Sequence, residues 1–87
     1  TSIYPNPAVD EVNISLYLPE SGVIRLELYD LSGRKVMERA EGELGEGEQV
    51  TVVDTSGLQS GVYTVRVVFA GGGLGSSTDV SKLVVVR

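Results

Sequence analysis

The sequence predicts an all-β fold, an antiparallel sandwich of about seven short strands, on three observations. Apolar and polar residues alternate with a period of two over most of the 87 residues, as in strands with one face on a core. No stretch keeps the spacing of an amphipathic helix. Clusters of Gly, Asp, Ser and Pro separate the alternating segments at the spacing usual for sandwiches. The length predicts one domain with a single modest core.

The first half of the chain contains three clear strands, at residues 12–18, 23–29 and 34–40, and a possible short strand at 2–4. Each clear strand places alternate apolar side chains on one face. The turn Asp30-Leu31-Ser32-Gly33 closes a hairpin, because Asp30 can accept hydrogen bonds from the following amides and Gly33 can adopt a positive φ. In residues 23–29 we expect three side chains to point outward, those of Arg25, Glu27 and Tyr29.

The second half is expected to hold three more strands and two longer connections. The strands cover residues 49–54, 61–69 and 80–87. An acidic, turn-rich loop is expected at residues 41–48, and a glycine-rich flexible connection at residues 70–78.

The stretch Leu58-Gln59-Ser60-Gly61-Val62-Tyr63 lies where the chain is expected to cross between sheets. It is typical of a tyrosine corner, in which the Tyr63 hydroxyl bonds back to the upstream backbone. A plain turn followed by a core tyrosine is the alternative. A tyrosine corner favours an immunoglobulin-like or fibronectin-III-like sandwich. Whether the stretch is a tyrosine corner or a plain turn, the expected role of Tyr63 is structural.

Composition excludes most chemistry. The chain has no cysteine and no histidine, so it lacks a thiolate nucleophile, the usual general base and the commonest zinc ligands. Ser81 and Lys82 are neighbours on a strand and point to opposite faces, so they cannot form a catalytic pair. The net charge of −5, without a basic cluster, argues against nucleic acid, and no apolar stretch is long enough to span a membrane. We therefore expect no catalysis and no cofactor.

Acidic residues gather in the 41–48 loop and beside three turns, at Asp10, Asp30 and Asp54. The loop lacks the ligand spacing of an EF-hand, so a solvated loop is the favoured interpretation. A metal shared between two turns stays open.

Tyr17 and Tyr29 are expected to face outward on neighbouring strands. Two exposed rings could form a platform for a sugar, although cross-strand aromatic packing is the commoner explanation. An accessory sandwich that binds glycan or assists a parent enzyme is therefore the second candidate function, and a purely structural spacer between domains is the third.

Four stretches, in this order, resemble the C-terminal sorting domain of the type IX (Por) secretion system. They are Tyr4-Pro5-Asn6-Pro7-Ala8 with Val12-Asn13-Ile14 after it, Leu28-Tyr29-Asp30-Leu31-Ser32-Gly33-Arg34-Lys35-Val36, Leu58-Gln59-Ser60-Gly61-Val62-Tyr63, and Lys82-Leu83-Val84-Val85-Val86-Arg87. Each is weak alone, and the four in order cover nearly the whole chain.

The resemblance implies a non-catalytic signal at the C-terminus of a larger secreted protein, with residues 1–87 as one sorting domain. Its partners would be an outer-membrane translocon and a sortase, and a cargo domain would be covalently linked upstream. The cargo would pass through the periplasm and then reach the outer-membrane surface or the medium.

The last strand, residues 80–87, is expected to leave its end, and one edge, open to another protein. Such a strand can be recognised by strand addition, with Lys82 and Arg87 setting the register by charge. The two prolines of the first motif make its segment stiff and extended. The expected recognition and signature residues are Tyr4, Pro5, Asn6, Pro7, Asp30, Gly33, Arg34, Gly61, Tyr63, Lys82, Leu83, Val84, Val85, Val86 and Arg87.

Overall fold

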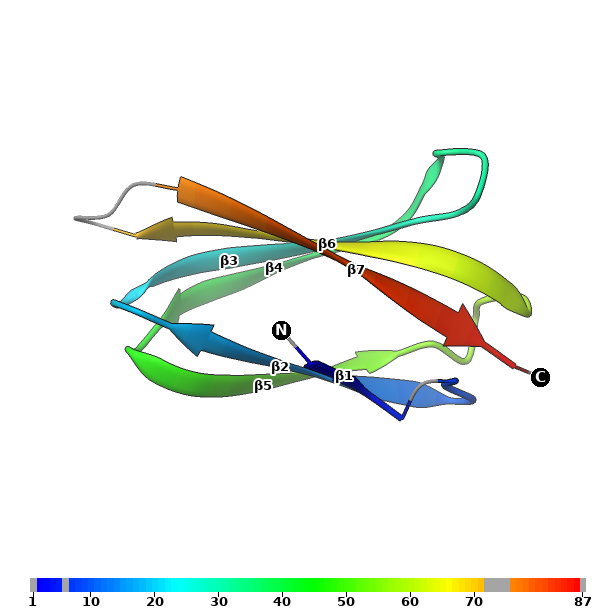
Figure 1. Cartoon of the computed structure of the whole chain (residues 1–87), viewed down its shortest axis with the longest axis horizontal. Coiled ribbons are helices and arrows are strands. Elements are labelled where there is room, and N and C mark those ends of the chain that lie inside the picture. The colour runs from blue at the N-terminus through cyan, green and yellow to red at the C-terminus, as the bar shows by residue number, and fades with distance from the viewer. Residues whose placement is uncertain (1, 6, 72–75, 87) are drawn as a thin grey trace.

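The computed structural model describes residues 2–5, 7–71 and 76–86. Seven strands follow one another along the chain (Figure 1). They are β1 (Ser2–Tyr4), β2 (Glu11–Leu18), β3 (Gly22–Tyr29), β4 (Lys35–Leu44), β5 (Gly47–Asp54), β6 (Gly61–Gly71) and β7 (Ser76–Val85). Every strand expected from the alternation is present, and so is the short strand at the start.

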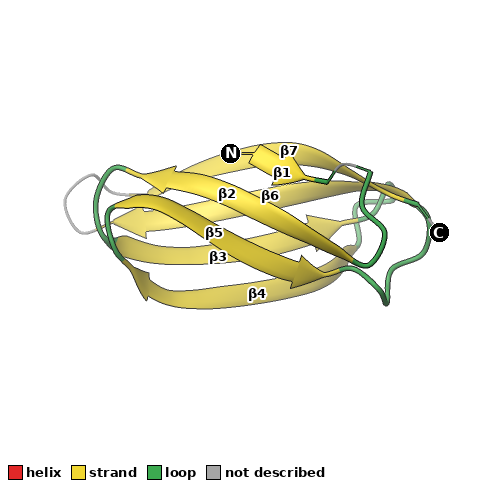
Figure 2. Cartoon of the chain, turned by 90° about the horizontal axis from the view of Figure 1, so that it is seen from below, coloured by secondary structure: helices red, strands yellow, loops and turns green. Residues whose placement is uncertain are grey.

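The strands form two antiparallel sheets that face each other (Figures 1 and 2). The three-stranded sheet has the order β1-β2-β5, and the four-stranded sheet has the order β4-β3-β6-β7. The molecule measures 40 × 23 × 17 Å along its principal axes. The all-β, two-sheet architecture predicted from the sequence is confirmed.

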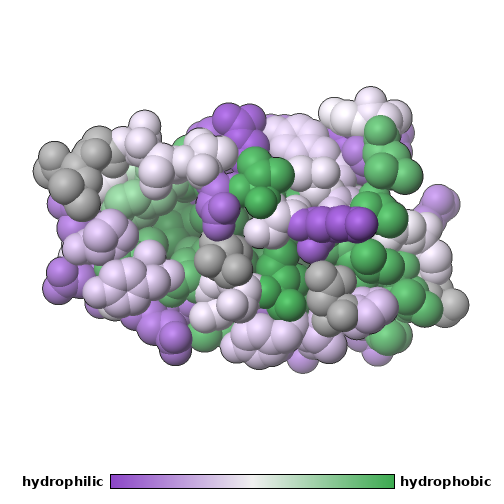
Figure 3. Space-filling model, viewed as in Figure 1, coloured by the Kyte–Doolittle hydropathy of each residue, from purple (hydrophilic) through white to green (hydrophobic). Residues whose placement is uncertain are grey.

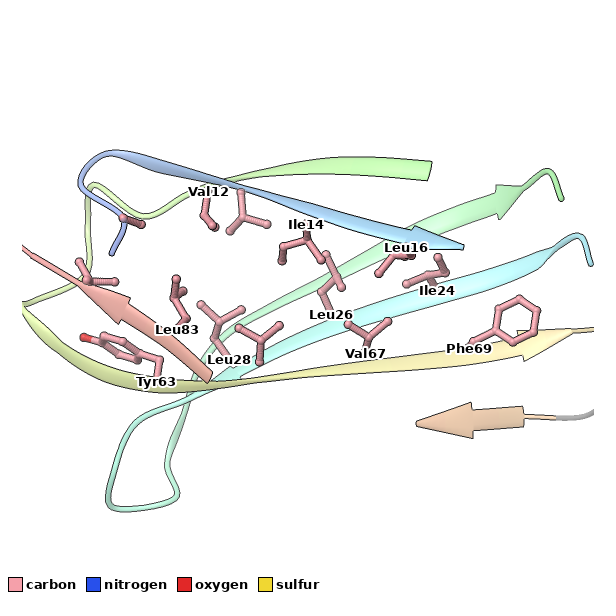
Figure 4. Close-up of a cluster of buried hydrophobic side chains, with 14 of the residues drawn as sticks. Val12, Ile14, Leu16, Ile24, Leu26, Leu28, Tyr63, Val67, Phe69 and Leu83 are labelled. Atoms are coloured by element: carbon pink, nitrogen blue, oxygen red, sulfur yellow. The ribbon is translucent and has the colours of Figure 1, made fainter. Parts of the chain in front are cut away.

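The core lies between the sheets and is built mainly from the alternate apolar residues of β2, β3, β5, β6 and β7 (Figure 4). Fully burying one such side chain contributes roughly 1.5–3 kcal/mol. The buried apolar residues are Ala8, Val12, Ile14, Leu16, Leu18, Ile24, Leu26, Leu28, Val53, Tyr63, Val65, Val67, Phe69, Leu83 and Val85.

The acidic loop expected at residues 41–48 is wrong. β4 continues to Leu44 and β5 begins at Gly47, so most of this stretch is strand. Both strands lie at the edge of their sheet, where glutamates on an exposed face meet water rather than the core. Arg39 on β4 joins the two edges, because it donates a hydrogen bond of 2.6 Å to the Val52 carbonyl on β5. Its side chain also pairs with Glu41 on its own strand, at 3.3 Å.

The flexible connection expected at residues 70–78 is also shorter than predicted. β6 extends to Gly71 and β7 begins at Ser76, with Ala70 paired to Ser76. Polar residues can extend an edge strand because its backbone pairs with one neighbour while its side chains remain in water. Gly72 and Gly73 lie outside the described residues.

The last strand is part of the core. Leu83 and Val85 on β7 are 0% and 1% exposed, whereas Val86, just after the strand, is 46% exposed. Within the last motif, Leu83 and Val85 therefore pack in the core, whereas Val86 lies at the surface.

We predict that Leu83→Ala lowers the free energy of unfolding by ~2–5 kcal/mol, because it leaves a cavity in a closely packed core. Val86→Ala is the matched control and should cost no more than about 0.5 kcal/mol. Denaturant titration of both variants measures the two values. Equal costs would mean that β7 is not packed as described.

Candidate functional site

All four motifs of the chain meet at one end of the sandwich, which we call the motif-bearing end. It is formed by the turn 30–34, the corner 58–63, the segment 4–8 and the end of β7. In Figure 1 these parts lie on the right, beside the C-terminal label. The turn and the corner line a shared hollow of about 530 Å³. Residues far apart in the sequence thus form one continuous surface.

Ala8 holds the end of β7 in place. Its amide donates a 2.8 Å hydrogen bond to the Val84 carbonyl, and its carbonyl accepts one of 2.8 Å from the Val86 amide. Val85 therefore lies between Ala8, in a parallel bridge, and Gly61, its antiparallel partner on β6. The end of the strand was expected to be open, and this expectation is wrong here, because the backbone of Ala8 pairs with Val84 and Val86. β7 does lie at a sheet edge.

The first motif changes its partner sheet over a few residues. Tyr4 ends β1, which pairs with β2, and Ala8 pairs with β7 in the opposite sheet. The Tyr4–Pro5 peptide bond is cis, and the Asn13 side chain donates a 3.2 Å hydrogen bond to the Tyr4 carbonyl. Pro5 and Pro7 lack an amide donor, so the segment between the two pairings cannot continue as a regular strand. Asn6 lies outside the described residues.

The turn after β3 forms as predicted. The Asp30 carboxylate accepts hydrogen bonds from the amides of Ser32 and Arg34, at 2.9 and 3.0 Å, and from the Ser32 hydroxyl at 2.6 Å. Gly33 has φ +88°, a conformation that favours glycine. The Ser32 side chain, the two amides and the nearby Arg34 charge hold the pKa of Asp30 below its usual value. The turn is therefore rigid and presents Leu31 and Arg34 outward.

The tyrosine corner is confirmed. The Tyr63 hydroxyl donates a 2.7 Å hydrogen bond to the Gln59 carbonyl, and the ring is buried against the core. Tyr63 pairs with Leu83 across the strands, as the close-up of the core shows (Figure 4). The corner thus connects the turn at residues 58–61 to the last strand.

The expected signature residues divide into buried and exposed groups. Tyr63, Leu83 and Val85 are buried, so no partner can contact their side chains in the folded domain. Lys82 and Val86 are exposed, and the Arg34 side chain is 78% exposed. Arg87 lies outside the described residues.

Leu31 is an exposed residue that sequence reasoning missed. Its side chain is 81% exposed at the tip of the turn, the largest exposed fraction among the large apolar residues of the described chain. The sequence signal that could have identified it is an apolar residue placed between two turn-forming polar residues, Asp30 and Ser32.

A second missed feature is a charge cluster on the outer face of the four-stranded sheet. Glu27 was expected to point outward, and it does, but it is only 5% exposed. Its carboxylate accepts a 3.1 Å hydrogen bond from the Tyr29 hydroxyl and forms ion pairs at 3.3–3.7 Å with Arg25, Lys35 and Arg66. Lys35 also pairs with Glu38, three residues further along β4. The cluster is a cross-strand network in which every charge has a partner.

Burial on its own would raise the pKa of Glu27. The hydrogen bonds from Tyr29 and Lys35, together with the charges of Lys35 and Arg25, outweigh that effect and lower it. The Lys35 pKa is raised, first by its hydrogen bond with Glu38 and further by Glu27, with burial opposing. The ionised carboxylate is therefore the form that the folded sheet stabilises.

The aromatic platform expected from Tyr17 and Tyr29 is wrong. Tyr17 lies on β2 in the three-stranded sheet, and Tyr29 lies on β3 in the four-stranded sheet, so they do not share a face. The turn between the two strands crosses between sheets and is not a hairpin.

In the described part of the chain, no three acidic side chains gather closely enough to hold a metal ion. The Asp54 carboxylate accepts a 2.9 Å hydrogen bond from the Ser56 amide, a turn-stabilising contact like that of Asp30. The same residues include no helix that could cross a membrane.

A protein family described as the secretion system C-terminal sorting domain matches residues 2–85. No curated protein and no solved structure matches the chain. The match covers all seven strands and the segments that form the motif-bearing end.

We predict that Glu27→Gln destabilises the protein most at neutral pH. A carboxylate whose pKa is lowered on folding stabilises the fold above its ordinary value of 4.5, and this contribution is lost as the pH falls through the folded-state pKa. Unfolding free energies of wild type and variant should therefore converge as the pH falls from 4.5 through the lower folded-state pKa.

Glu43→Gln is the control, because it removes the same charge from an exposed position of β4. Its difference from wild type should stay small at every pH. A Glu27→Gln difference that does not change on acidification would contradict the assigned network.

Proposed function

The chain belongs to the family of secretion-system C-terminal sorting domains, and on this premise we propose that it directs a cargo, joined on its N-terminal side, through the type IX system. The observation that carries the proposal is the family match over residues 2–85. A sorting domain of this type implies contact with the secretion machinery, and export to the cell surface or beyond.

In finer detail, we propose that the cargo crosses the periplasm, meets an outer-membrane translocon, and is processed at the cell surface by a sortase. The domain itself would perform no chemistry and would be the ligand of that machinery. Sorting-signal domains are in general not catalytic, in keeping with the absence of cysteine and histidine from this chain.

We also propose that the fold is the immunoglobulin-like or fibronectin-III-like sandwich. The 3 + 4 arrangement of strands, the tyrosine corner at the start of β6 and the first motif's change of sheet support this assignment.

Recognition is assigned to the motif-bearing end, together with the adjoining edge of β7. Four exposed side chains from two separate motifs lie there, and they are Leu31, Arg34, Lys82 and Val86. Arg34, whose Nε lies 3.5 Å from the Asp30 carboxylate, and Lys82 are the basic side chains among these four. A partner that binds this surface would contact an apolar and cationic pattern, and could extend the sheet along β7.

Removing residues 82–87 would not test this assignment. The deletion takes away Leu83 and Val85, which are fully buried, and the pairing with Ala8. Loss of export would then follow from loss of folding. Substitutions of exposed side chains separate recognition from stability.

We predict that the double variant Leu31→Asp/Val86→Asp, fused to a passive reporter in a type IX-competent host, is exported about tenfold less than wild type, a loss of ~1.4 kcal/mol in binding. Val50→Asp is the matched control. Val50 is 51% exposed on β5, against 46% for Val86, and lies on the outer face of the other sheet.

Thermal unfolding of the purified domains checks that all variants remain folded. Undiminished export of the double variant would reject recognition at this end and leave the sorting function intact. Failure of the wild-type fusion to be exported in that host would reject the sorting function itself.

A further inference from the structure

An apolar hollow opens between the two sheets at the end opposite the motifs. It has a volume of about 220 Å³ and is bordered by the end of β2, the end of β6 and the start of β7. Its walls include Leu16, Leu18, Val67 and Phe69, which are buried but keep 3–7% of their surface exposed. Figure 3 shows this hollow on the left, with a hydrophobic floor and a more polar rim.

The described residues of β1 lie beside the middle of β2 and do not border the hollow. β1 covers only Asn13, Ile14 and Ser15 of β2. On the other side, β5 pairs with β2 along its whole length, up to Leu18 opposite Gly47. Among the described residues, none pairs with residues 16–18 on the β1 side.

The register of β1 gives the direction in which its pairing with β2 would continue upstream. Ser2 pairs with Ser15 and the strands are antiparallel, so moving upstream from Ser2 means moving along β2 toward Leu18. The next three positions would lie opposite Leu16, Tyr17 and Leu18. Ile3 faces the core opposite Ile14, so the positions opposite Leu16 and Leu18 would face the hollow, and the one opposite Tyr17 would face water.

We propose that the segment joining the cargo to this domain extends β1 along residues 16–18 and closes the hollow. Its occupant is thus the protein's own upstream chain, in register with β1. The continuity of an existing strand pairing supports this occupant, and so does the upstream position of the cargo that the proposed function gives it. It does not depend on how the motif-bearing end is recognised.

The inner face of β7 is consistent with this occupant. Near the motif-bearing end, Leu83 and Val85 on that face are buried, whereas Ser77 and Asp79 at the hollow are polar and exposed. An apolar segment that covered the inner face of β7 as well would bury Ser77 and Asp79 in hydrocarbon, which is unfavourable for polar groups. A single extended segment placed against β2 instead covers the leucines and leaves the polar rim in water.

The proposal is tested by hydrogen exchange on residues 16–18 in two proteins. One carries ten native residues before Thr1, and the other carries ten Gly-Ser residues there. Successive amides of a strand point to opposite edges, so at least one amide of this stretch faces the β1 side. The native extension should slow its exchange about tenfold relative to the Gly-Ser extension, which corresponds to ~1.4 kcal/mol.

Two variants of the native extension provide the matched controls. Asp at the position two residues before Thr1, which would face the hollow, should abolish the protection. Asp immediately before Thr1, which would face water beside Tyr17, should leave the protection within about twofold of the native extension.

Three results would overturn the proposal. They are equal exchange with native and Gly-Ser extensions, equal effects of the two Asp variants, and protection that increases with protein concentration. The last result would mean that a second copy supplies the strand. Because all measurements use purified protein without secretion machinery, a negative result would leave the sorting function untouched.

Discussion

The two hydrogen bonds made by Ala8 connect the beginning of the chain to its end, and the rest of the motif-bearing end depends on them. Through them, a segment that leaves the three-stranded sheet is attached to the outer strand of the four-stranded sheet. Ala8 is completely buried, and a larger side chain there would have to displace the core. The bridge holds Val85 between two backbone partners and fixes where Val86 leaves the fold.

The remaining contacts of this end position the other motifs relative to that bridge. Thr55, buried at the end of β5, donates a 2.8 Å hydrogen bond from its amide to the Asp10 carbonyl, two residues after Ala8. Tyr63 packs opposite Leu83, and its hydroxyl holds the turn at Gln59. The signature residues thus act in two ways. Buried ones define the geometry, and the exposed ones that they hold in place are available to a partner.

Sequence alternation predicted the strands because it records which face of a strand meets the core, and this is a local property. It placed Ile14, Leu26 and Val65 in the core correctly. It could not predict which strands are neighbours. Tyr17 and Tyr29 were placed together because β2 and β3 are consecutive, yet the turn between them crosses the sandwich. A turn sequence rich in Pro, Ser and Gly suits a crossing as well as a hairpin.

The same limit explains the errors at the candidate site. Glu27 alternates outward as predicted, but its burial comes from long side chains on β4 and β6, which alternation does not identify as neighbours. The end of β7 was expected to be open because nothing in the local sequence indicates that Ala8, some seventy-five residues earlier, pairs with it. Local turn chemistry succeeded at Asp30 and Gly33, where donor and acceptor lie within four residues.

The direction of β1 bears on where a cargo would lie under the proposed function. β2 runs from the motif-bearing end to the opposite end, and β1, antiparallel to it, approaches from that opposite end. A chain that enters along β1 therefore keeps the cargo away from the exposed side chains of the motifs. The sandwich is 40 Å long. Cargoes of different size could then present the same surface to the secretion machinery, because the fold and not the cargo sets its surroundings.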